Sequence, residues 1–159
     1  MLRRQVELVV RDDRAQVTQR VAIARELPGE GNNFILGGGS TVAVALASVA
    51  LELNMIYATN SATATAFTHE GFNRNVFRLN PNGWSLYSVS GRAVAERFPQ
   101  VLRWGAILPD YSAGHDNARA FLRAVQKYHP KSASKDFALL KPVAVGMAQT
   151  DFRPRSTRC

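Results

Sequence analysis

Two short runs of hydroxyl-bearing and small residues carry the groups of this chain that are best suited to chemistry. The first is Gly37-Gly38-Gly39-Ser40-Thr41, and the second runs from Thr59 to Thr65, where hydroxyls alternate with alanines. Each follows a short apolar run that is typical of a buried strand. In a parallel α/β sheet, turns after neighbouring strands lie together at the carboxyl edge, where such sheets bind ligands. The sequence therefore predicts one ligand site built from both turns.

The glycine-rich turn lacks the residues that three enzymatic motifs require. A phosphate-binding P-loop needs a lysine before the hydroxyl residue, and none is present. Val42 stands where the dinucleotide fingerprint and the nucleophile elbow each need a glycine. What remains is a neutral site for a carboxylate or another anion, made of amides at a helix start and the hydroxyls of Ser40 and Thr41. The alternative is a tight turn in which Ser40 only caps the helix.

The second turn offers hydroxyl and backbone groups but no charge and no base. Such a set suits hydrogen bonding to a small zwitterion better than it suits catalysis. The alternative is a polar loop whose threonines bond to their own backbone.

Titratable residues elsewhere show no catalytic or metal-binding spacing. Three histidines lack the patterns of metal sites, and we expect them on the surface: His69, His115 and His129. The acidic residues that end apolar runs, Asp12, Asp13 and Asp110, are expected in turns and caps rather than as a catalytic pair.

Apolar periodicity predicts strands and helices in alternation, which is the pattern of an α/β protein with a mostly parallel sheet. The predicted strands are Gln5–Arg11, Asn33–Leu36, Met55–Ala58, Val76–Leu79, Trp104–Leu108 and 137–140, the last extending as far as Val145. The predicted helices lie at 16–27, 40–53, 86–98 and 118–129, and the second of them is apolar nearly all round, so it should be buried.

Composition indicates one globular domain. The chain has 159 residues, of which 46% are hydrophobic and 20% charged, and its longest apolar run falls short of the roughly 20 residues of a membrane span. No signal peptide is visible, and the single cysteine, Cys159, allows no disulfide within the chain. Seven Lys/Arg and two Asp from Lys127 onward place 7 − 2 = +5 of the net charge of +8 in the last fifth. We interpret this as a solvated basic tail, with nucleic-acid binding as the alternative.

Six motifs in order resemble a known family over nearly the whole chain. They are residues 6–13, the Gly-Gly-Gly-Ser-Thr turn, residues 57–63, Val76-Phe77-Arg78 with Asn80-Pro81-Asn82, Pro109-Asp110-Tyr111 followed by Gly114-His115-Asp116, and Thr150-Asp151-Phe152. Together they are similar to the leucine/isoleucine/valine-binding type of periplasmic solute-binding protein, the receptor of branched-chain amino acid ABC transporters.

The resemblance implies a type I periplasmic binding fold of two lobes, each a flavodoxin-like three-layer sandwich, which close on an amino acid or a related small carboxylate. It implies delivery of the ligand to a membrane permease, a periplasmic location, no catalysis, no cofactor, no nucleic acid and no membrane insertion. Ser40 or Thr41 would supply a hydroxyl, Ser61 a backbone contact and Thr63 a second hydroxyl. The implied ligand-binding set is Ser40, Thr41, Ser61, Ala62, Thr63 and Tyr111.

The chain departs from the family in three respects. Ala113 stands where the family usually has a tyrosine, so Tyr111 would have to take over the stacking contact. The chain starts at the family's second strand, and in a flavodoxin-like order the missing first strand would leave a gap in the sheet. It stops shortly after Thr150-Asp151-Phe152. We therefore expect an incomplete first lobe at 1–145, the start of a crossover to a missing second lobe at 146–159, and weak ligand binding.

Two other functions stay open at this point. A cytoplasmic sensor domain of the same fold would bind amino acids or amides. A flavodoxin-like hydrolase would use Ser40 as its nucleophile, and covalent labelling of that serine would separate it from a binding protein.

Overall fold

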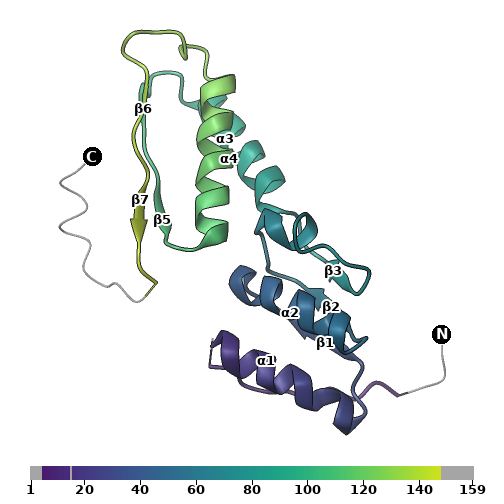
Figure 1. The fold of residues 1–159 in the computed structure, drawn as a ribbon. Coiled ribbons are helices and arrows are strands. Elements are labelled where there is room, and N and C mark those ends of the chain that lie inside the picture. Colours follow the sequence, from purple (N-terminus) through teal and green to yellow (C-terminus); the bar gives the residue numbers. More distant parts are fainter. Residues whose placement is uncertain (1–4, 15, 148–159) are drawn as a thin grey trace.

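The fold is an α/β arrangement in a computed structural model that describes residues 5–14 and 16–147 (Figure 1). Its elements are α1 (Val17–Glu26), the 3-10 helix η1 (Leu27–Glu30), β1 (Phe34–Gly37), α2 (Ser40–Glu52), β2 (Ile56–Thr59), the 3-10 helix η2 (Thr65–Thr68), β3 (Val76–Arg78), α3 (Gly83–Arg97), β4 (Arg103–Trp104), β5 (Ile107–Pro109), α4 (Ser112–Tyr128), β6 (Ala138–Leu139) and β7 (Val143–Val145). Most predicted elements are confirmed to within a few residues.

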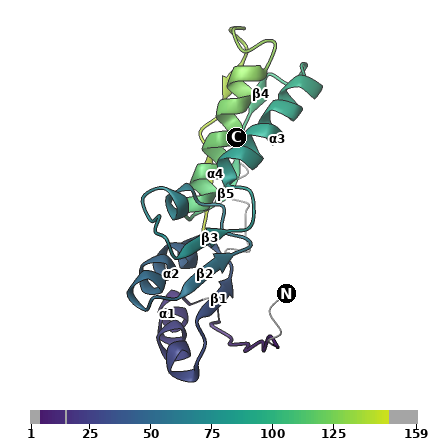
Figure 2. The same cartoon turned by 90° about the vertical axis from the view of Figure 1, so that its right-hand side faces the viewer.

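The elements pack as two units that follow one another along the chain (Figures 1 and 2). We call residues 16–79 the N-terminal unit and residues 83–147 the C-terminal unit. In the N-terminal unit the parallel sheet β1-β2-β3 is packed with α1 and α2, whereas in the C-terminal unit α3 packs along α4 beside two parallel pairs, β4-β6 and β5-β7. The strands are parallel, as predicted, but they form three sheets rather than one.

The β1-β2-β3 sheet is covered by helices on one face only, among the residues described. Tyr57 and Val76 on that face join the core formed with α1 and α2, to which α2 contributes six buried residues, as the sequence predicted. The opposite face is open: Phe34 and Leu36 are each 56% exposed, Ile56 is 45% exposed and Phe77 is 50% exposed. Parallel sheets are usually covered on both faces, so this apolar face has no partner in the described chain.

The prediction of a strand at Gln5–Arg11 is wrong. The segment has no strand pairing, and its apolar side chains Val6, Leu8 and Val10 are 96%, 80% and 76% exposed. Within the described residues, no backbone hydrogen bond connects it to β1. A strand exists only when a neighbouring strand satisfies its backbone groups, and local sequence cannot supply that neighbour.

Two predicted strands in the C-terminal unit are each divided. Trp104–Leu108 becomes β4 and β5, which pair with different partners, and residues 137–145 become β6 and β7. Pro142 lies between β6 and β7, and it has no N–H to donate to a ladder. The crossover predicted at 146–159 lies outside the described residues, apart from residues 146 and 147.

The prediction that His129 lies on the surface is wrong, whereas His69 and His115 are exposed as expected. His129 is 2% exposed, with its ring centroid 6.1 Å from that of Trp104 and 5.0 Å from that of Phe137. Its Nδ1 accepts a hydrogen bond from the Lys131 amide at 3.2 Å. Because one nitrogen serves the following turn and the ring packs among aromatics, the residue is part of the core.

Candidate functional site

The glycine-rich turn and the second turn lie side by side, as the sequence predicted. Strands β1 and β2 pair in parallel with Gly37 beside Thr59, so the chain leaves both strands at the same edge of the sheet. The site is therefore positioned by a two-strand register that continues directly into the hydroxyl-rich residues.

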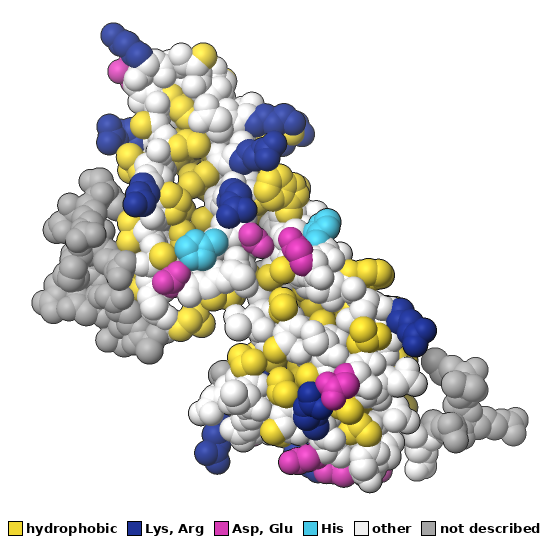
Figure 3. Space-filling model, in the orientation of Figure 1, with side chains coloured by type: hydrophobic (Ala, Val, Ile, Leu, Met, Phe, Trp, Pro, Cys, Tyr) yellow, Lys and Arg dark blue, Asp and Glu magenta, His cyan; other side chains and the backbone are white. Residues whose placement is uncertain are grey.

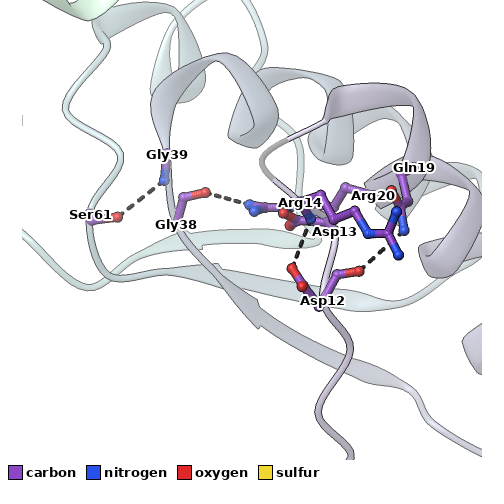
Figure 4. Close-up of polar contacts among 8 residues, drawn as sticks. All are labelled: Asp12, Asp13, Arg14, Gln19, Arg20, Gly38, Gly39 and Ser61. Atoms are coloured by element: carbon purple, nitrogen blue, oxygen red, sulfur yellow. Dashed lines mark hydrogen bonds and ion pairs between the residues drawn. The ribbon is translucent and has the colours of Figure 1, made fainter. Parts of the chain in front are cut away.

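Serine hydroxyls bind the two turns to each other. Ser40 Oγ accepts hydrogen bonds from the amides of Thr63 and Ala64 at 3.0 and 3.1 Å, and Ser40 is only 4% exposed. In the reverse direction, Ser61 Oγ accepts a hydrogen bond from the Gly39 amide at 3.1 Å (Figure 4). Ser40 is thus an internal anchor of the site and caps none of its own helix's amides.

The same geometry argues against a hydrolase that uses Ser40. A nucleophilic serine needs an adjacent base to accept its proton, and it must be reachable by substrate. In the described chain, the hydrogen-bond partners of Ser40 Oγ are two backbone amides and no titratable side chain. The hydroxyl is also enclosed, so it is neither activated nor accessible.

Arg20 holds the glycine-rich turn from the side of α1. Its Nη1 donates to the Gly38 carbonyl at 2.5 Å, and its guanidinium forms an ion pair with Asp13 (Figure 4). Asp12 serves the preceding turn by accepting a hydrogen bond from the Arg14 amide at 2.8 Å, in line with the predicted turn role of these acids. A Cβ atom at Gly38 would lie 2.2 Å from Ser61 Oγ, so a larger residue there would displace the Ser61 hydroxyl from the Gly39 amide.

Two residues of α4 reach the second turn from the C-terminal unit. Asp116 Oδ2 accepts a hydrogen bond from the Thr65 amide at 3.2 Å, and Asn117 Nδ2 donates to Thr63 Oγ1 at 3.4 Å. These contacts make the second turn the junction of the two units. Sequence analysis missed both roles, although Asp116 belongs to one of the six family-like motifs, because contacts across 51 and 54 residues leave no local pattern.

Arg78, at the end of β3, also binds the second turn. Its Nη2 donates to the Ala64 carbonyl at 2.7 Å and to Thr68 Oγ1 at 3.1 Å, and its guanidinium carbon lies 5.5 Å from the centre of the Phe67 ring. Burial lowers the pKa of this guanidinium below its ordinary value. Burial likewise raises the pKa of the Tyr57 phenol, whose ring lies under Gly37.

The six predicted ligand residues are not equivalent in the structure. Thr41 and Ser61 are exposed, Thr63 and Tyr111 are partly buried, and Ser40 and Ala62 are buried. The Ala62 amide already donates to Thr59 Oγ1, and its carbonyl accepts a hydrogen bond from Asn80. No hydrogen bond joins the Tyr111 side chain to either turn within the described chain. Thr41 and Ser61 therefore carry the hydroxyls that are exposed to a ligand from solvent, although Ser61 Oγ also accepts the hydrogen bond from the Gly39 amide.

The amides at the start of α2 add donors next to these hydroxyls. The helix begins at Ser40, and the first backbone bond into it runs from Ala43 to the Gly39 carbonyl. Within the described residues, the amides of Ser40, Thr41 and Val42 consequently have no backbone acceptor, as expected in a first helical turn. A carboxylate beside Thr41 would meet N–H donors, a hydroxyl and the positive end of the helix.

Hollows lined by other described residues lie elsewhere on the molecule. One of about 470 Å³ lies along α4 and is lined by His115, Arg119 and Arg123 among others. The other, of about 680 Å³, lies between residues 6–11 and β1. Neither is lined by the predicted ligand residues. Across the described residues, no helix is long and apolar enough to cross a membrane, and no group of His, Cys, Asp or Glu could hold a metal ion.

Parallel strands, a helix start and two hydroxyl turns place the candidate site at the carboxyl edge of an α/β sheet. Comparison with known proteins gives the family. The sequence matches the periplasmic binding protein family over residues 1–155, and the chain belongs to that family. No curated protein matches the chain.

Solved structures of ABC transporter binding proteins share the fold. A leucine-binding protein from Thermotoga maritima superposes with a TM-score of 0.80 at 20% identity over 98% of this chain. A solute-binding protein from Rhodopseudomonas palustris BisB5, in complex with 3,4-dihydroxybenzoic acid, gives 0.80 at 20% identity over 96%. A branched-chain amino acid transporter protein from Rhodopseudomonas palustris CGA009 gives 0.62 at 25% identity over 94%. This chain spans 42%, 39% and 38% of the length of these three chains.

Proposed function

We propose that this chain is a part of the solute-binding component of an ABC transporter and that it binds a small carboxylate at the two turns. The observation that carries the proposal is the juxtaposition of exposed Thr41 and Ser61 with the free amides at the start of α2. These groups donate hydrogen bonds without a fixed charge, which suits reversible binding of a carboxylate.

Amino acids and aromatic acids share the group that this site would bind. Similar structures include a leucine-binding protein and solute-binding proteins in complex with 3,4-dihydroxybenzoic acid, benzoate and 4-hydroxybenzoate. The carboxylate is their common feature, and the second turn adds Thr63, which lies between Ser40 and Asn117. The periplasm and a membrane permease belong to the same proposal. So does the assignment of residues 1–145 to one lobe.

The test is equilibrium dialysis of the purified chain with radiolabelled leucine and radiolabelled benzoate. Binding is expected to be weak, because bound small molecules usually have about 70–90% of their surface covered and the described site covers a ligand from one side. Saturable binding of either acid, lost when the acid is replaced by its amide, would support the proposal.

Two variants test whether the carboxylate binds at the two turns. Thr41→Val removes one free hydroxyl and should weaken carboxylate binding about tenfold, in line with a lost hydrogen bond to a charged group. Ser48→Ala, at an exposed position of the same helix, is the matched control and should bind as the parent does. The proposal fails if no carboxylate binds, or if Thr41→Val and Ser48→Ala behave alike.

A further inference from the structure

Charge is divided unequally between the two units. Residues 83–147 carry nine Lys/Arg and four Asp/Glu, which gives a net charge of +5, whereas residues 5–79 carry six and seven, which gives −1. Figure 3 shows Lys and Arg side chains, in dark blue, over the unit that holds α3 and α4. Salt screens exposed charges beyond about 8 Å, so a partner at the C-terminal unit meets its positive charge and little of the other unit's charge.

Three cations of this unit lie on one side of α4. Arg119, Arg123 and Lys127 follow one another at intervals of four residues, a spacing that places side chains on the same side of a helix. All three are exposed, and the Arg119 side chain keeps 72% of its surface in solvent. The buried residues of α4 are glycine, alanine, leucine and valine at other positions. The cations are therefore turned away from the packing of the unit.

Contacts between α3 and α4 add a fourth cation and two aromatic rings to this surface. The Arg92 guanidinium carbon lies 4.9 Å from the centre of the Tyr128 ring, and Lys127 Nζ lies 5.0 Å from it. The Arg123 guanidinium carbon lies 5.5 Å from the centre of the Trp84 ring, which is 40% exposed. We call the four cations of this surface the basic face: Arg92, Arg119, Arg123 and Lys127.

Two carboxylates lie beside the basic face and offset part of its charge. Glu96 Oε1 pairs with Arg92 at 2.8 Å, and Asp116 Oδ1 lies 3.9 Å from Arg119 Nη1. Within the described chain, no ion pair engages Arg123 or Lys127. Exposed Arg97 and Lys131 follow at the ends of α3 and α4, so the positive surface continues beyond the four residues.

The geometry favours a lipid surface over nucleic acid as the partner. Single strands are bound largely by stacking bases on aromatic rings, but the Trp84 and Tyr128 rings already hold cations at 4.9 to 5.5 Å. Lipid headgroups need only cations dispersed over an outer surface, and a half-exposed tryptophan suits the boundary between water and lipid.

We propose that the basic face of α3 and α4 holds the protein against an anionic lipid surface by charge, without insertion into the bilayer. None of its four residues belongs to the predicted ligand set. The proposal therefore stands independently of the carboxylate site.

The first test is sedimentation of the intact chain with lipid vesicles. Vesicles with about 30% phosphatidylglycerol in phosphatidylcholine should bind the protein at low salt, and vesicles of phosphatidylcholine alone should not. Raising the salt to about 0.5 M should release the bound protein, because the attraction is screened. Equal binding to both vesicles, or binding that salt does not weaken, would overturn the proposal.

Variants of matched charge locate the contact. Arg119→Gln, Arg123→Gln and Lys127→Gln together should weaken binding about a hundredfold, since each cation near an anionic membrane contributes about fivefold. Arg11→Gln, Arg14→Gln and Arg74→Gln together remove the same charge from exposed positions outside the C-terminal unit, and they should change binding less than about twofold. Equal losses in the two variants would show that net charge alone acts, and would overturn the assignment.

Two further measurements separate the lipid from other partners. Arg119→Lys with Arg123→Lys keeps the charge and should bind vesicles as the parent does, even if the glutamine variant fails to fold. Loss of binding in this lysine variant would contradict a purely electrostatic contact. Fluorescein-labelled oligothymidylate should bind more weakly than the anionic vesicles at equal concentrations of accessible phosphate. Tighter binding of the oligonucleotide would make nucleic acid the partner and overturn the proposal.

Discussion

The two units of the molecule are held together in different ways. The core of the N-terminal unit contains large side chains, with Tyr57 and Phe67 each fully buried and 5.9 Å apart between ring centroids in an edge-to-face arrangement. In the C-terminal unit, the buried positions of α3 are Gly83, Gly91 and Ala95, and those of α4 are mostly alanine. The core between sheet and helices in the N-terminal unit is filled by side-chain volume, whereas the contact between α3 and α4 depends on the close approach of two helix backbones.

This difference shows which substitutions each unit should tolerate. A core of large side chains loses stability when volume is removed, because a cavity remains. A contact between small residues loses stability when volume is added, because the helices cannot approach. Both tryptophans, Trp84 and Trp104, lie in the C-terminal unit, so their fluorescence reports on that unit while far-UV circular dichroism reports on both.

Phe67→Ala should have the largest effect and should be confined to the N-terminal unit. The ring is fully buried, contacts Tyr57 and lies under the Arg78 guanidinium, so its loss should cost about 3–5 kcal/mol. Urea unfolding followed by circular dichroism should show a transition at a lower urea concentration than in the parent, from unfolding of the N-terminal unit. If the midpoint of tryptophan fluorescence shifts by the same amount, the two units unfold together, and the inference that each has its own source of stability is contradicted.

Gly91→Ala should destabilise the C-terminal unit by about 1–3 kcal/mol, as overpacking does. A Cβ atom there would lie 2.5 Å from the Phe121 carbonyl oxygen and 2.9 Å from Ala124 Cβ, so α3 and α4 would have to separate. The urea midpoint of tryptophan fluorescence measures the effect. Ser90→Ala, at an exposed position next to it, is the control, and equal midpoints for the two variants would contradict the packing argument.

Ser40→Ala should weaken the connection between the two turns by about 1–3 kcal/mol, because the amides of Thr63 and Ala64 lose their acceptor in a buried place. Ser61→Ala is the matched control at an exposed position and should change stability by no more than about 0.5 kcal/mol. Thermal unfolding of both variants measures whether Ser40→Ala destabilises the protein more than Ser61→Ala does. The reverse order would show that Ser61, and not Ser40, is the anchor.

Glu52→Gln should give the smallest effect, and one that depends on pH. The hydrogen bond from Arg25, at 2.6 Å, lowers the pKa of the Glu52 carboxyl below its ordinary value. The stabilisation is therefore present above the unfolded pKa of about 4.3 and is lost as pH falls through the lower folded pKa. Urea midpoints of parent and variant should differ at pH 7 and converge progressively as the pH falls below the unfolded value of about 4.3. A constant difference would exclude the ion pair as its source.

Local pattern was enough to predict most helices and the order of strands. Val17, Val21 and Ala24 recur at helical spacing and place α1, and Pro28-Gly29 ends it, as observed. The neighbouring position of the two turns was also predictable, because parallel strands place the turns that follow them at one edge. Both inferences use information that lies within a few residues or in the strand order.

The roles of individual site residues could not be predicted in the same way. Ser40 and Ser61 have the same chemistry, yet one is buried and saturated by two amides while the other is exposed. Arg20 and Asn117 join the site across 18 and 54 residues. The burial of His129 depends in the same way on aromatic residues from other segments.

The sequence by itself determined that this protein is an α/β chain of parallel strands with two hydroxyl-rich turns at one sheet edge, because periodicity and turn residues act locally. Only the tertiary structure decided that residues 5–11 have no strand partner among the described residues, that a groove lies beside β1, and that Ser40 faces inward. Pairing and burial depend on which segments meet in space. For that reason the same Val-Glu-Leu-Val-Val run that is typical of a strand is left unpaired here.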